Sequence, residues 1–176
     1  GAFNSVLFAM NDMKKADELW EEVTMDKLVP ISKSELIKRG IGLYIGGKNL
    51  QLAKKFLNYK LEHGAIANDG AIEVVEKYLD FNKIKENNKI CYAACTKLSD
   101  FSAKYFKIND FDEETGKKIV LASASLPLIY DCTEVLGEKY IDGGIADNIP
   151  IQPVYGENCN IIIVVLLSKE VQVDRT

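Results

Sequence analysis

A short strand that ends in Asp142, Gly143 and Gly144 is the feature that most constrains the fold of this chain of 176 residues. Tyr140 and Ile141 favour a pleated, half-buried strand, whereas an Asp-Gly-Gly sequence forces the backbone into a turn. The carboxylate of Asp142 is therefore expected at the edge where a strand becomes a loop. Functional groups collect at such edges in α/β sheets, because loops on a rigid scaffold carry them.

The remaining sequence alternates between helical and strand patterns, which predicts a layered α/β/α domain. Apolar spacing predicts helices over residues 2–10, 14–23, 34–39, 49–63, 69–79 and 112–124, strands over residues 89–96 and 103–108, and a charged linker over residues 82–88. The run Ile161–Leu167 is apolar at every position, so we expect a fully buried strand within a mostly parallel sheet.

Several side chains have predicted places in this scheme. The first helix is apolar almost throughout, so Phe3, Leu7 and Phe8 are expected in the core. Asp12 is a predicted N-cap of the second helix, and Trp20 on that helix is expected to be buried rather than lipid-facing. In the helix capped by Asp69, the apolar positions expected to face inward are Ile72, Val75 and Leu79.

Composition sets limits on the class of protein. With 47% hydrophobic residues the chain buries a sizeable core, and we expect one domain with a mainly helical part (1–88) and a strand-rich part (89–176). The net charge of −4 disfavours nucleic-acid binding. The four cysteines form no CxxC pair, which favours reduced thiols and a cytoplasmic location. The longest apolar run is too short for a transmembrane segment, and no leader is visible.

Three blocks of the sequence resemble the second signature region of the patatin-like phospholipases: Ala122–Pro127, Tyr140–Gly144 and Asp147–Pro150. The resemblance implies a three-layer α/β/α patatin-like domain that hydrolyses lipid acyl esters at a membrane surface with a Ser-Asp dyad. It places the catalytic aspartate at Asp142, with Gly143 and Gly144 as motif support, and it requires no metal or organic cofactor.

The first nine residues are similar to the family segment that begins with the last glycine of the Gly-x-Ser-x-Gly nucleophile elbow, which falls on Gly1. On this resemblance the nucleophilic serine stands two residues before Gly1, and the glycine-rich oxyanion loop also precedes it. We therefore expect an N-terminally incomplete domain, roughly its C-terminal two-thirds, that is inactive in isolation. The sequence upstream of Gly1 would decide the matter.

Asp142 also has a structural interpretation, because aspartate readily caps a turn such as the one that Gly143 and Gly144 form. The alternative function is then a non-catalytic α/β binding or interaction module. A third possibility is a metal-dependent hydrolase in which Asp147 and Asn148 join Asp142, although their spacing does not match a Ca²⁺ loop and favours a structural turn.

The other candidate groups favour structural roles. His63 is the single histidine and precedes Asp142, whereas a Ser-His-Asp hydrolase of this fold class places its histidine after the aspartate. Ser5, Ser123 and Ser125 lie outside any Gly-x-Ser-x-Gly elbow, so Ser5 is expected in the core and the other two at a packed helix end. The Gly46-Gly47-Lys48 sequence lacks the P-loop spacing.

Overall fold

The computed structural model describes residues 1–23, 62–64, 69–127 and 129–166. The predicted helix 34–39, nearly all of the predicted helix 49–63, and the Gly46-Gly47-Lys48 sequence lie outside the described residues. In chain order the described elements are α1 (Ala2–Ala9), α2 (Met13–Glu22), α6 (Asp69–Tyr78), α7 (Phe81–Glu86), β1 (Tyr92–Lys97), β2 (Ala103–Lys107), η1 (Ile108–Asp110), α8 (Glu113–Ser123), β3 (Thr133–Val135), β4 (Glu138–Asp142), η2 (Gly143–Ile145) and η3 (Gln152–Glu157).

The strands form one four-stranded sheet in the order β2-β1-β4-β3, and all of its pairs are antiparallel. The α/β class is confirmed, but the expected mostly parallel sheet is wrong. The reason lies in the connections, because β3 and β4 are joined by only Leu136 and Gly137, both at positive φ, as a tight hairpin turn requires. A parallel pair would need a crossover of about a dozen residues or more.

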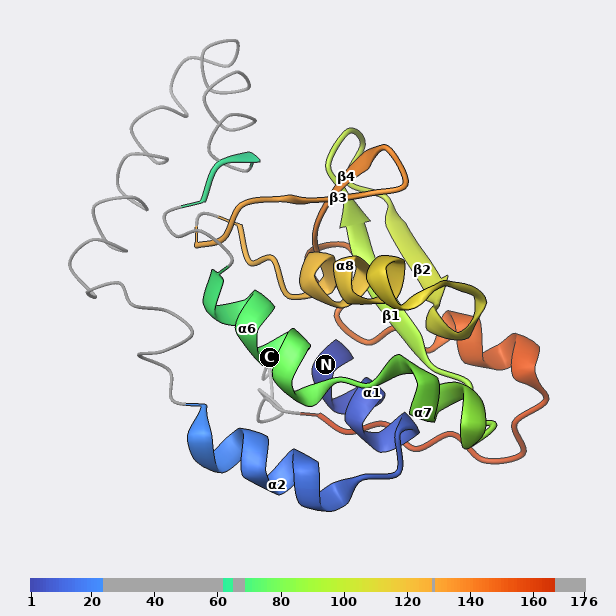
Figure 1. Ribbon diagram of the computed structural model, residues 1–176. Coiled ribbons are helices and arrows are strands. Elements are labelled where there is room, and N and C mark those ends of the chain that lie inside the picture. The colour runs from blue at the N-terminus through green and yellow to red at the C-terminus, as the bar shows by residue number, and fades with distance from the viewer. Residues whose placement is uncertain (24–61, 65–68, 128, 167–176) are drawn as a thin grey trace, which may run out of the picture.

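One face of the sheet supports the hydrophobic core. The pairing register places Ala93, Cys95, Phe106 and Tyr140 on this face, and the rings of Phe106 and Tyr140 meet edge to face at 5.3 Å. Helix α8 lies across β1 on the same side (Figure 1), and Cys95 Sγ donates to the carbonyl of Ile119 in α8 at 3.6 Å. Fully buried apolar side chains fill the space between sheet and helices, among them Val6, Leu7, Met10, Leu19, Val75, Ile84, Ile119 and Val120.

The opposite face of the sheet holds the segment that follows β4. The Tyr105 hydroxyl donates to Asp147 Oδ2 at 2.5 Å, and the Tyr92 hydroxyl donates to Glu157 Oε1 at 2.5 Å. Lys107 Nζ pairs with the same Glu157 oxygen at 2.9 Å. The stretch from η2 to η3 is thereby fixed to β1 and β2 on the side away from α8.

Three of the described α-helices begin at an aspartate N-cap. Asp12 accepts a hydrogen bond from the Lys15 backbone N–H at 3.1 Å, which confirms its predicted N-cap role. Asp112 caps α8 in the same way. Asp80 caps α7, so the prediction of a linker over residues 82–88 is wrong. Most of this segment is helical, because Phe81 and Ile84 lie one helical turn apart and are both buried.

Three predicted core residues lie at the surface instead. Phe8 is 65% exposed, Trp20 is 52% exposed and Ile72 is 41% exposed. Their helices each bury one stripe only, so an apolar residue off that stripe faces outward. Polar groups nevertheless engage two of the rings, since Lys89 Nζ lies 4.4 Å from the centre of the Phe8 ring and the Trp20 indole donates to Asn4 Oδ1 at 2.9 Å.

The apolar run near the C-terminal end departs most from expectation. Residues 161–166 belong to no strand and are exposed, with Ile163 at 84% and Val164 at 45%. The exposure of successive residues alternates from Ile161 to Val165, which is typical of an extended chain whose two faces differ. Within the described residues no backbone hydrogen bond reaches this segment, and a β-branched run forms a strand only when another backbone pairs with it.

Candidate active site

Asp142 is the last residue of β4, so the prediction that the strand ends there is confirmed. Its backbone N–H donates to the carbonyl of Ser125 at 2.9 Å, and it lies opposite Cys95 of β1 in the pairing register. Because directly opposed residues point to the same face, the Asp142 side chain lies on the helical side of the sheet. The side chain is half-buried there.

The environment of the Asp142 carboxylate changes its acidity. Burial raises the pKa of Asp142 above its ordinary value, because the charged form loses solvation. One opposing influence is weaker: the Gly144 backbone N–H, which donates to Asp142 Oδ1 at 2.7 Å.

The two glycines of the motif have different tasks. A Cβ at Gly143 would lie 2.1 Å from the carbonyl oxygen of Ala94, so only glycine allows the turn to approach the β1 backbone this closely. Gly144 instead contributes its N–H to Asp142 Oδ1. A Cβ at Gly144 would meet side-chain oxygens of Asp142 and Asn148, at 3.0 Å and 3.3 Å.

Thr96 is part of the site and was missed in the sequence. Its fully buried hydroxyl donates to the backbone carbonyl of Asp142 at 2.7 Å and accepts a hydrogen bond from the Ala146 N–H at 3.1 Å. The available signal was a polar residue next to Cys95 in an otherwise apolar strand, because a buried hydroxyl needs a hydrogen-bond partner.

The other candidate side chains lie at the surface or are engaged by other partners. Ser125 is buried, donates to the Leu121 carbonyl at 2.9 Å and shares a hydrogen bond with Thr133, as a packing role predicts. Ser5 is exposed, which corrects its expected burial, and His63 is exposed at the surface. Asp147 is held by Tyr105 on the other face of the sheet.

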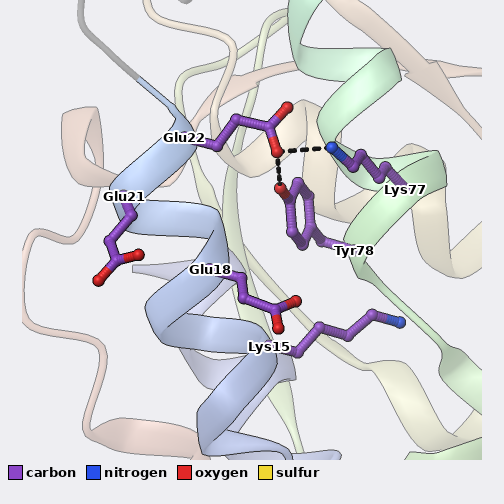
Figure 2. Close-up of a pocket in the computed structure, with 6 residues that line it drawn as sticks. All are labelled: Lys15, Glu18, Glu21, Glu22, Lys77 and Tyr78. Carbon is purple, nitrogen blue, oxygen red and sulfur yellow. Dashed lines mark hydrogen bonds and ion pairs between the residues drawn. The ribbon is translucent and has the colours of Figure 1, made fainter.

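A pocket of about 450 Å³ lies elsewhere, between α2 and α6 (Figure 2). Glu22 Oε2 accepts hydrogen bonds there from Lys77 Nζ and from the Tyr78 hydroxyl, each at 2.5 Å. The hydrogen bond to Glu22 raises the pKa of Tyr78. None of the predicted site residues lines this shallow pocket, and its rim is charged, so we assign it no part in acyl chemistry.

Two kinds of feature are absent from the described residues. No group of three histidine, cysteine, aspartate or glutamate side chains is arranged there to hold a metal ion. In the same part of the chain, no helix is both long enough and apolar enough to cross a bilayer.

Comparison with known families identifies the class of protein. The model of the patatin-like phospholipase family matches residues 1–155, which covers most of the chain and includes the whole of the Asp-Gly-Gly turn. The chain therefore belongs to the patatin-like phospholipases, a family of lipid acyl hydrolases. Searches of curated proteins and of solved structures gave no significant match.

Proposed function

We propose that the protein is a serine-dependent lipid acyl hydrolase in which Asp142 is the general base of a Ser-Asp dyad. The observation that carries this proposal is a half-buried carboxylate at the end of β4, whose pKa burial raises. On the family resemblance the nucleophile elbow ends at Gly1, so the elbow and the end of β4 should meet in the full-length protein. A dyad needs this convergence, since base and nucleophile must come within hydrogen-bond reach.

The proposed reaction proceeds through an acyl-serine intermediate. The serine, two residues before Gly1 in the full-length protein, attacks the ester carbonyl while Asp142 accepts its proton. Backbone amides of the glycine-rich loop stabilise the oxyanion, and the proton passes to the departing alcohol. Asp142 then removes a proton from water as the water oxygen attacks the acyl carbon, the bond between the acyl group and the serine oxygen breaks, and the proton returns to that oxygen as the fatty acid leaves. No metal or organic cofactor enters these steps.

The carboxylate of Asp142 is arranged for proton transfer. Oδ1 is occupied by the Gly144 N–H, whereas Oδ2 makes no hydrogen bond with any residue in the described ranges. One oxygen thus fixes the orientation of the group and the other is available to a proton. The raised pKa brings the group nearer to the range in which a base works well at neutral pH.

The sequence contains no Gly-x-Ser-x-Gly motif, so the 176 residues supply the base but not the nucleophile. We propose that they form part of a single patatin-like domain and have no esterase activity in isolation. The substrate is a lipid acyl ester taken from a membrane surface, and the reduced thiols favour a cytoplasmic enzyme.

The test is Asp142→Asn in the full-length protein, assayed with a chromogenic short-chain acyl ester. Asparagine is nearly isosteric and still accepts the Gly144 N–H, but it cannot take the proton, so hydrolysis should be lost while the fold is kept and the melting temperature does not fall. Asp147→Asn is the matched control, because Asp147 follows closely in the chain and is engaged by Tyr105. Turnover at the wild-type rate in Asp142→Asn would exclude the base role. Joint loss of folding and activity would favour the structural turn of a binding module.

A further inference from the structure

We propose that Thr96 is the positioning residue of this site, which fixes the Asp142 carboxylate from the opposite face of the sheet. The proposal rests on the proposed base role of Asp142. It assigns a specific task to a threonine whose hydroxyl bonds to the backbone of Asp142 rather than to its carboxylate.

The geometry begins with the two faces of β1. Cys95 and Asp142 are direct partners in the register and share the helical face, so Thr96, the next residue, points to the other face. From that face Thr96 Oγ1 contacts the backbone at the end of β4. It donates to the carbonyl of Asp142 at 2.7 Å and accepts from the N–H of Ala146 at 3.1 Å.

These two hydrogen bonds close the turn that carries the carboxylate. One holds the last residue of β4, and the other holds the residue just after η2, so a single hydroxyl links both ends of the Asp142–Ala146 turn. Between them lies Gly144, whose N–H orients Asp142 Oδ1. Gly143 lies against the backbone of Ala94 in the same strand, so the turn contacts β1 through Asp142, Gly143 and Ala146.

The chemistry of the hydroxyl makes this role specific. Thr96 is fully buried, and its hydroxyl uses its one donor and one of its acceptor positions on the turn. Valine has nearly the same shape but offers neither, so the Asp142 carbonyl and the Ala146 N–H would each lose this partner. The turn would then move to recover hydrogen bonds, and a displacement of about 1 Å at a reacting group can cost about a hundredfold in rate.

Amide hydrogen exchange of the folded chain reports on the hydrogen bonds of the Asp142–Ala146 turn and needs no enzymatic reaction. In Thr96→Val the amides of Ala146 and Gly144 should lose protection, while the amides of the β1–β2 ladder keep theirs. Thr96→Ser retains the hydroxyl and should restore protection at both positions. Thr133→Val is the matched control, because it removes a hydroxyl from the same sheet that bonds to Ser125 rather than to the turn.

Kinetics of the full-length protein measure the functional consequence. Thr96→Val should lower kcat by about a hundredfold with KM changed less than about twofold, and Thr96→Ser and Thr133→Val should stay close to wild type. If Thr96→Val fails to fold, Thr96→Cys, with its much weaker donor, takes its place with the same expected ranking.

The outcomes separate the two proposals. Full activity in Thr96→Val together with inactivity in Asp142→Asn would overturn the positioning role and leave the dyad intact. Wild-type activity in Asp142→Asn would instead overturn the dyad, whatever the exchange data show. Equal protection of Ala146 in wild type and Thr96→Val would refute the positioning role on structural grounds alone.

Discussion

Replacing Gly143 by alanine should destabilise the fold by about 3 kcal/mol, near the upper end of the usual cost of overpacking a core. The added Cβ would lie 2.1 Å from the oxygen and 2.5 Å from the carbon of the Ala94 carbonyl. Ordinary contacts between carbon and oxygen begin near about 3.3 Å, so the turn and β1 must separate by about 1 Å. Both opposing atoms belong to the backbone of a central strand and cannot rotate away.

Equilibrium chemical denaturation, with thermal melting in parallel, measures this cost. For a chain of this size about 3 kcal/mol corresponds to a fall in Tm of roughly 6–12 °C. Gly156→Ala is the control, because a Cβ there has nothing within 4 Å and should leave stability unchanged or slightly raised. Gly144→Ala should fall between the two, since its Cβ would meet only the ends of side chains. A difference below about 0.5 kcal/mol between Gly143→Ala and Gly156→Ala would refute the close approach, since surface changes produce as much.

Two further predictions concern ionisable groups. Because burial raises the folded-state pKa of Asp142, the folded protein binds that proton more tightly than the unfolded chain, and the contribution of Asp142 to stability is lost as pH rises through the raised value. Asp142→Asn should therefore have a higher melting temperature than wild type at pH 7. The difference should vanish well below pH 4, which is about the pKa of the unfolded chain. A difference in melting temperature that is the same at every pH would contradict this. Burial also raises the pKa of Cys91 and Cys95 to about 12. Iodoacetamide should accordingly modify the exposed Cys159 first and these two only after unfolding, and mass spectrometry of the timed products would detect any early labelling of the buried pair.

Local features of the chain were predictable because their causes lie within a few residues. Asp12 begins a helix since its side chain meets an N–H three residues later, and the same chemistry recurs at Asp112. Strand β4 ends at Asp142 since Asp-Gly-Gly turns the backbone wherever it occurs. The family motif in this turn likewise identified the class of protein, which the family match confirms.

Features that depend on partners distant in the sequence were not predictable in this way. An apolar strand pattern does not specify the direction of its neighbour, so the antiparallel sheet became apparent only from the pairing of β1 with β4. Residues 161–166 have every local property of a buried strand, yet in the described structure no backbone pairs with them. The sequence likewise shows Phe8 as apolar without showing which side of α1 meets the sheet.

The candidate site likewise combines residues that a local motif identified with residues that only tertiary structure brings together. Asp142 and its two glycines were identified from the sequence, because a turn motif is a contiguous signal. Thr96 lies in a different strand, and its hydroxyl meets the turn only because antiparallel pairing brings the end of β4 beside β1. The raised pKa of Asp142 depends on burial under the helices, which is likewise a property of the packed chain. The sequence by itself thus determined the chemical group and the turn that carries it, whereas tertiary structure decided its acidity, its neighbours and its orientation, since these arise from contacts between segments far apart in the chain.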